Sequence, residues 1–237
     1  MMSPDTKGNG AGRMAAELFL KDGGDGAGLG RPFEGKGAPR TLDRHSTGWY
    51  RVLEATKKIC VLGDPAVGKT SVIRRYALDC FDEGYLTTIG ARVLNRTQVL
   101  RFPGQSAELR LHLKIWEISG QNRHLELYPS YYLGAEGAII VGDATRVETQ
   151  VNLWKWIEGF RAAAGRVPII LVVNKTDLMD ETEFDLELMD EISHEFRCPF
   201  RMSSARNGAN VDNVFRELAY QLAGRKPLSG PRRGRAC

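Results

Sequence analysis

The sequence predicts an α/β fold, in which a six-stranded, mostly parallel sheet with one antiparallel pair carries helices on both faces. Three observations lead to this prediction. Apolar runs of strand length alternate with helical spacing along residues 57–224. Two of the runs, 138–143 and 168–173, are almost continuously apolar, which is typical of parallel strands covered on both faces. Two others, 91–102 and 108–117, are joined by only five residues, as in a hairpin.

The first half of this region supplies three of the strands. A strand at 57–62, "KKICVL", precedes a glycine-rich turn, and a helix at 69–80 follows with apolar residues at helical spacing. An irregular segment, 81–90, leads into the hairpin. In the second hairpin strand every other residue from Leu109 to Ile115 is apolar, which predicts one buried face.

The second half continues the alternation of strands and helices. Strands are expected at 138–143, 168–173 and 198–203, and helices at 154–163, 185–196 and 211–222. The last helix has an apolar stripe at Val211, Val214, Phe215, Leu218 and Leu222.

The ends of the chain differ from this domain. Eleven of the first 48 residues are glycine, so we expect residues 1–50 to form a disordered extension, with "WYRVL" (49–53) docking on the domain. Residues 225–237 carry five basic and no acidic side chains and are expected to form a flexible tail. This tail would either solubilise the chain or contact an acidic membrane weakly.

Composition excludes several classes of protein. The net charge is +4, but residues 57–224 alone carry −2, whereas a nucleic-acid binder carries positive charge on its folded domain. No apolar run is long enough to span a bilayer, and the N-terminus lacks a signal layout. Met2 and the single terminal Cys237 meet neither the myristoylation nor the prenylation pattern. We therefore expect a cytoplasmic monomer without a stable lipid anchor.

The turn after the first strand, "GDPAVGKTS", fits the phosphate-binding loop pattern Gly-x-x-x-x-Gly-Lys-Thr. In this pattern backbone N–H groups surround phosphates, Lys69 reaches the β- and γ-phosphates, and the Thr70 hydroxyl binds Mg²⁺. The expected phosphate contacts are Gly63, Asp64, Pro65, Ala66, Val67, Gly68, Lys69, Thr70 and Ser71. An ordinary glycine-rich turn is the alternative, but strand, complete motif and helix together speak against it.

The stretch "NKTD", 174–177, follows the strand at 168–173 and so lies at the carboxyl end of a parallel strand, where ligands bind. Asp177 can accept hydrogen bonds from the N1–H and the 2-amino group of guanine. Adenine offers neither donor, and the unpaired carboxylate would discriminate against it on the order of 10⁴-fold or more. The stretch therefore predicts a guanine site.

Three further stretches, "TTIG" (87–90), "WEISGQ" (116–121) and "SSAR" (203–206), complete an ordered set that resembles the Ras superfamily of small GTPases. The similarity covers about 57–224, and "YYLGAEGAIIV" and "NGANV" look most like the Rab-type branch. This set of motifs, combined with the expected absence of a lipid anchor, resembles what prokaryotic, especially archaeal, members of the superfamily have. The resemblance implies a P-loop NTPase fold with six strands and five helices, GTP and GDP binding with Mg²⁺, and slow GTP hydrolysis as a molecular switch.

The resemblance also implies individual roles. Thr88 would contact Mg²⁺ and the γ-phosphate, Gly120 would donate its N–H to the γ-phosphate, and Gln121 would orient the attacking water. With Lys69, Thr88 and Gln121 would form the catalytic set. Effectors and regulators would contact 83–92 and 117–133 in the GTP state.

At the base, Asn174 would support the site, Lys175 would lie along the base plane, and the Ala205 N–H would donate to guanine O6. Ser204 and Arg206 flank Ala205 and belong to the same expected guanine-binding set as Asp177.

The sequence departs from the family at two positions of the predicted site. Glu117 stands where the family has an aspartate that holds Mg²⁺ through a water; we expect it to serve with a small shift, and weaker Mg²⁺ binding with slower hydrolysis is the alternative. Pro65 removes one N–H and fixes φ. Its ring would either crowd an incoming arginine of an activator protein or simply rigidify the loop.

Two other functions are compatible with parts of the sequence. A pseudo-GTPase scaffold with little or no hydrolysis is favoured by Glu117 and Pro65, but the retained Lys69, Thr70, Thr88 and Gln121 speak against it. An ATP-using P-loop enzyme, such as a small kinase, is disfavoured by "NKTD".

Overall fold

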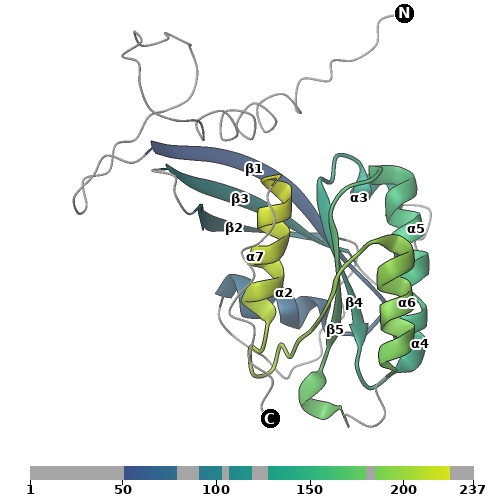
Figure 1. Ribbon diagram of the computed structural model, residues 1–237. Helices are drawn as coiled ribbons and strands as arrows, with labels where there is room; N and C mark the ends of the chain where they lie inside the picture. The colour runs from purple at the N-terminus through teal and green to yellow at the C-terminus, as the bar shows by residue number, and fades with distance from the viewer. Residues whose placement is uncertain (1–50, 79–90, 103–106, 119–127, 180–184, 225–237) are drawn as a thin grey trace, which may run out of the picture. The chain divides into compact units, whose positions relative to one another are not determined.

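The computed structural model describes residues 51–78, 91–102, 107–118, 128–179 and 185–224 (Figure 1). Its strands are β1 (Arg51–Leu62), β2 (Ala91–Arg101), β3 (Ala107–Ile118), β4 (Gly137–Asp143), β5 (Ile169–Asn174) and β6 (Phe200–Met202). They form one sheet in the order β2-β3-β1-β4-β5-β6. β1, β4, β5 and β6 pair in parallel, and the five-residue connection makes β2 and β3 antiparallel. The predicted sheet is confirmed.

The helices are α2 (Lys69–Leu78), α3 (Tyr128–Tyr132), α4 (Val147–Val151), α5 (Leu153–Ala164), α6 (Leu186–Phe196) and α7 (Val211–Leu222). Only Asn152 separates α4 from α5, so the described residues contain five α-helices when these two count as one interrupted helix, α4–α5. A 3₁₀ helix at Thr176–Leu178 follows β5. α2 and α7 pack together on one side of the sheet, and α3, α4–α5 and α6 lie on the other (Figure 1). No helix in the described ranges is both long and apolar enough to cross a membrane.

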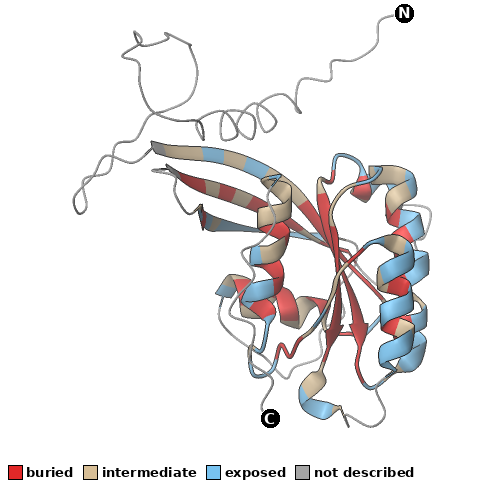
Figure 2. Cartoon of the chain, viewed as in Figure 1, coloured by how far each residue is buried: buried red, intermediate tan, exposed pale blue. Residues whose placement is uncertain are grey.

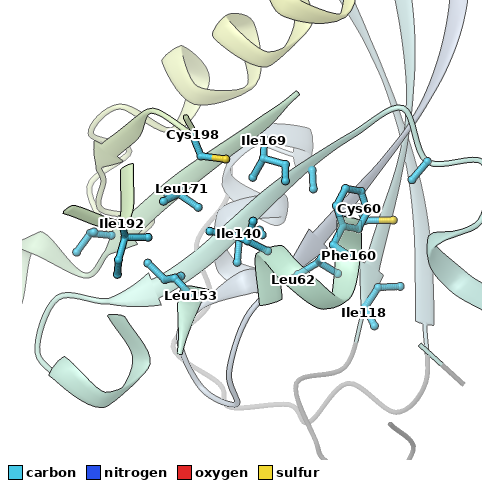
Figure 3. Close-up of a cluster of buried hydrophobic side chains, with 14 of the residues drawn as sticks. Cys60, Leu62, Ile118, Ile140, Leu153, Phe160, Ile169, Leu171, Ile192 and Cys198 are labelled. Atoms are coloured by element: carbon cyan, nitrogen blue, oxygen red, sulfur yellow. The ribbon is translucent and has the colours of Figure 1, made fainter. Parts of the chain in front are cut away.

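Alternate side chains of the parallel strands fill a core layer on each face of the sheet. β4 and β5 are buried over their whole lengths, as the continuously apolar runs predicted (Figure 2). On one face Leu153 and Phe160 of α5 pack in the same cluster as Leu171 of β5 (Figure 3). On the other face the rings of Tyr76 and Phe215 stack with their centroids 3.8 Å apart, which joins α2 to α7.

The register of the strands sets where the predicted motifs lie. β1 ends at Leu62, directly before the glycine-rich loop, and Leu62 pairs with Ile140 of β4. Asp143, the last residue of β4, pairs with Asn174, the last residue of β5. Because the carboxyl ends of parallel strands meet at one edge, the loop after β1 and the "NKTD" stretch leave the sheet at the same edge.

The structure differs from the prediction in three places. β1 begins at Arg51, six residues before the expected strand at 57, so part of "WYRVL" is sheet. The prediction missed this extension because "RVLEAT" lacks the continuous apolar run of "KKICVL". Helices α3 and α4 were not predicted, since five residues are too few to show a helical period. The predicted extension at 1–50 and tail at 225–237 lie outside the described residues.

The chain divides into two compact units. In the first, which includes residues 51–56 and 97–112, Leu100 and Leu111 are buried. The buried carboxylate of Glu108 there accepts from Arg101 and Arg110, with both N···O distances 3.1 Å. The second unit, which includes 57–78, 91–96 and 113–224, holds every site described below.

Candidate nucleotide-binding site

The loop between β1 and α2 depends on its two motif glycines. Gly63 has φ +135°, and a Cβ there would lie 2.1 Å from the carbonyl oxygen of Val141. Gly68 has φ +97°, and its Cβ would lie 2.3 Å from Nδ2 of Asn174. Residues with side chains are therefore excluded at both positions, because the loop lies directly against β4 and the end of β5.

Lys69, at the start of α2, is buried and folded back over the loop. Its Nζ donates to the carbonyl oxygens of Gly63, at 2.8 Å, and Asp64, at 2.7 Å. The pKa of Lys69 is lowered to about 8, chiefly by burial; Glu117 and Asp64 act in the opposite direction, and Arg146 lowers it by a smaller amount. The two hydrogen bonds to Gly63 and Asp64 hold the Lys69 ammonium within the loop, where it could neutralise a bound phosphate.

Thr70 and Glu117 bring two oxygen ligands together beside Lys69. Glu117 is 1% exposed near the end of β3, and the Thr70 hydroxyl donates to its Oε1. Within the described ranges no group of three or more His, Cys, Asp or Glu side chains forms a metal cluster. Mg²⁺ in nucleotide sites is usually held by one or two carboxylates together with phosphates and waters, so this pair fits Mg²⁺.

Asn174 joins the phosphate loop to the loop after β6. Its Nδ2 donates to the carbonyl oxygen of Val67 at 3.0 Å. Its Oδ1 accepts from the backbone N–H of Ala205 at 3.0 Å and from the Ser203 hydroxyl at 3.3 Å. The side chain is 1% exposed, so these bonds hold the two loops in a fixed relation.

A pocket of about 200 Å³ opens between these loops. It is lined by Gly68, Ser71, Asn174, Lys175, Asp177, Leu178, Ala205 and Arg206. Ser204 takes part indirectly, because its hydroxyl donates to Oδ1 of Asp177 at 2.5 Å. The pocket therefore gathers every residue predicted to bind guanine, either in its wall or against Asp177.

The family model of the Ras family matches residues 58–223, which is well over half of the chain. The chain belongs to the Ras family. Members of this family are small GTP-binding switch proteins.

This Ras-family domain also contains a buried carboxylate that sequence reasoning missed. Asp143 accepts from Lys175 Nζ at 2.6 Å and from Arg146 Nε at 3.1 Å. Burial favours its neutral form, but the hydrogen bonds from Lys175 and Thr145 outweigh burial and hold the pKa of Asp143 below its usual value. Arg146 also donates to the carbonyl oxygen of Pro65 at 2.9 Å. The sequence feature that could have identified Asp143 is a single carboxylate at the end of an apolar strand.

A second missed residue is Arg75 on α2. Its guanidinium donates to the carbonyl oxygens of Ala205, at 2.9 Å, and Arg206, at 2.6 Å. Both carbonyls belong to the "SSAR" loop, so α2 fixes one wall of the pocket. The Ala205 N–H, which the resemblance assigns to guanine O6, donates here to Asn174.

Three predicted residues of the γ-phosphate end, Thr88, Gly120 and Gln121, lie outside the described residues. The same is true of most of 83–92 and of 119–127 within the predicted partner-binding segments. Their roles stay predictions.

Proposed function

We propose that this Ras-family protein binds GTP and GDP with Mg²⁺ and hydrolyses GTP slowly, as a switch that partner proteins read through 83–92 and 117–133. The observation that carries the proposal is the bridge made by Asn174, which bonds to Val67 in the phosphate loop and to Ala205 in the pocket wall. Because Asn174 bonds to both the expected phosphate site and the expected base site, the arrangement suits a nucleotide, which has a phosphate and a base. We further propose that the protein is a cytoplasmic monomer of the Rab-type branch and of prokaryotic origin. These four properties rest on the sequence alone.

The chain's residues supply positioning and charge, which are the main requirements of phosphoryl transfer. Lys69 neutralises phosphate charge, the loop N–H groups orient the phosphates, and Gln121 orients the attacking water. Thr70, Glu117 and Thr88 would hold Mg²⁺, which would neutralise phosphate charge. Intrinsic GTP turnover in this class is on the order of 10⁻⁴ to 10⁻³ s⁻¹, which is slow enough for a switch that stays in the GTP state for minutes to hours.

Glu117 is compatible with this role. Its carboxylate already accepts from the Thr70 hydroxyl, so the longer side chain keeps a carboxylate oxygen beside the hydroxyl proposed to bind Mg²⁺. Pro65 is compatible as well, because its carbonyl oxygen is fixed by Arg146 and its missing N–H leaves the other loop donors in place.

A single-turnover GTP hydrolysis assay tests the proposal. The purified full chain is mixed with GTP and excess Mg²⁺, beside a Gln121→Leu variant. We expect slow turnover in the wild type that the substitution abolishes. Tight GTP binding without turnover in either protein would favour the pseudo-GTPase scaffold, and failure to bind guanine nucleotide would reject the site.

A further inference from the structure

The phosphate loop contains an acidic side chain that the proposed reaction does not use. Asp64 is held by two neutral donors: Asn152 Nδ2 reaches Oδ2 at 2.8 Å, and Trp156 Nε1 reaches Oδ1 at 2.8 Å. Asn152 lies at the junction of α4 and α5, and Trp156 lies one turn further along α5. One side of the interrupted helix thus holds both carboxylate oxygens.

A carboxylate at this position has an electrostatic consequence. Asp64 is the second residue of the loop, and its charge is close enough to Lys69 to raise the pKa of that lysine. A negative charge there repels bound phosphates and competes with them for the lysine. Hydrogen bonds from Asn152 and Trp156 spread this charge and fix the carboxylate toward α5.

We propose that Asn152 and Trp156 are positioning residues that hold the Asp64 carboxylate against α4–α5, and that this contact sets the affinity of the loop for the phosphates of the nucleotide. The inference rests on the proposed nucleotide binding and adds a regulatory element to it. A helix outside the sequence motifs thereby controls the electrostatics of the phosphate loop.

The test measures the affinity and the dissociation rate of a fluorescent GDP analogue on the full-length protein with Mg²⁺. The double variant Asn152→Ala/Trp156→Phe removes both donors and keeps an aromatic ring in place. We expect at least about tenfold weaker binding. Trp154→Phe is the matched control, because Trp154 is an exposed tryptophan of the same helix with Lys155 over its ring. It should stay within about twofold of the wild type.

Rescue separates charge repulsion from a general loosening of the loop. Adding Asp64→Asn to the double variant removes the charge and should restore most of the affinity, which a merely structural role would not predict. The preference for GDP over IDP, which lacks the 2-amino group, should be the same in every variant because the base pocket is untouched. Trp156→Phe alone, which removes one donor, should weaken binding about threefold or more and serves if the double variant does not fold.

Three results would overturn the inference. Unchanged GDP affinity in the double variant, or in Trp156→Phe, would show that the contact does not act on the nucleotide. A loss that Asp64→Asn fails to restore would show that charge is not the cause. A wild-type protein that binds no GDP would overturn the proposed function together with this inference, whereas the first two results leave that function standing.

Discussion

At the scale of single residues, the pocket between the phosphate loop and the loop after β6 is lined by polar side chains that bond to one another. Asp177 accepts from Ser204 and lies 4.0 Å from the Arg206 guanidinium, so its carboxylate is oriented at the pocket wall. Asn174 is bonded on both its oxygen and its nitrogen. Such a network is suited to discrimination between bases, because a ligand that leaves an oriented polar group unpaired binds more weakly.

Asp177→Asn tests this discrimination. The amide presents a donor where guanine requires acceptors, so GTP affinity should fall by about 100-fold or more while ATP affinity stays low. Competition of GTP and ATP against a fluorescent guanine nucleotide measures both. If ATP competes as well as GTP with the wild-type protein, the guanine assignment is wrong.

Lys69 is predicted to make nucleotide binding depend on pH. Its pKa is lowered to about 8 in the protein, and phosphate anions favour the ammonium form, so binding raises this pKa. Affinity for GDP should therefore be greatest below pH 8 and fall by up to about tenfold per pH unit above it. Equilibrium titrations between pH 7 and 9 check this, after correction for guanine ionisation measured on free GDP. A flat profile would contradict the prediction.

At the scale of elements, helix α4–α5 combines a buried core face with contacts to the phosphate loop. Leu153 and Phe160 are fully buried, whereas Asn152 and Trp156 reach Asp64. Gly159 lies in the interior of α5 on its exposed side, and a Cβ there would meet nothing within 4 Å. A glycine in that position weakens the helix without serving the packing.

Gly159→Ala should raise the free energy of unfolding by about 0.5 to 1 kcal/mol, because alanine has the higher helix propensity. Urea unfolding at a fixed GDP concentration measures the change. Gly142→Ala in β4 is the contrasting variant: its Cβ would lie 3.4 Å from the Thr149 carbonyl oxygen, so no gain is expected. Equal stabilisation by both variants would refute this reasoning.

At the scale of the whole molecule, the Ras-family match at 58–223 begins inside β1, which starts at Arg51. β1 lies between β3 and β4 in the strand order, but its register with β4 begins at Ile59, so residues 51–56 precede the part of β1 that pairs with β4. The strand therefore begins before the residues that the family model matches.

Two fragments test whether the start of β1 stabilises the domain. Residues 51–224 should bind GDP with the affinity of the full chain. Residues 57–224 lack the start of β1 and should lose more than about 2 kcal/mol of unfolding free energy through lost strand hydrogen bonds. Urea unfolding and GDP titration compare the two. Equal stability of both fragments would show that 51–56 contribute nothing to the domain.

The sequence by itself determined the features that depend on local spacing. The alternation of apolar runs and helical patterns predicted every strand of the sheet, and Gly63, Gly68 and Lys69 marked the loop because a phosphate-binding turn requires those residue types in a short span. Asp177 was predicted for the same reason, since the chemistry of guanine recognition is carried by four consecutive residues.

Only the tertiary structure decided the contacts that join these segments. Asp143 and Lys175 are 32 residues apart, and Asp64 is 88 residues from Asn152 and 92 from Trp156. No spacing rule links such pairs, because they meet only where the strand order places β1, β4 and β5 side by side. Helices α3 and α4 are too short to be stable alone, so packing rather than propensity forms them. The motif residues can thus be identified from the sequence, whereas the contacts between distant segments that hold them depend on the order of the strands.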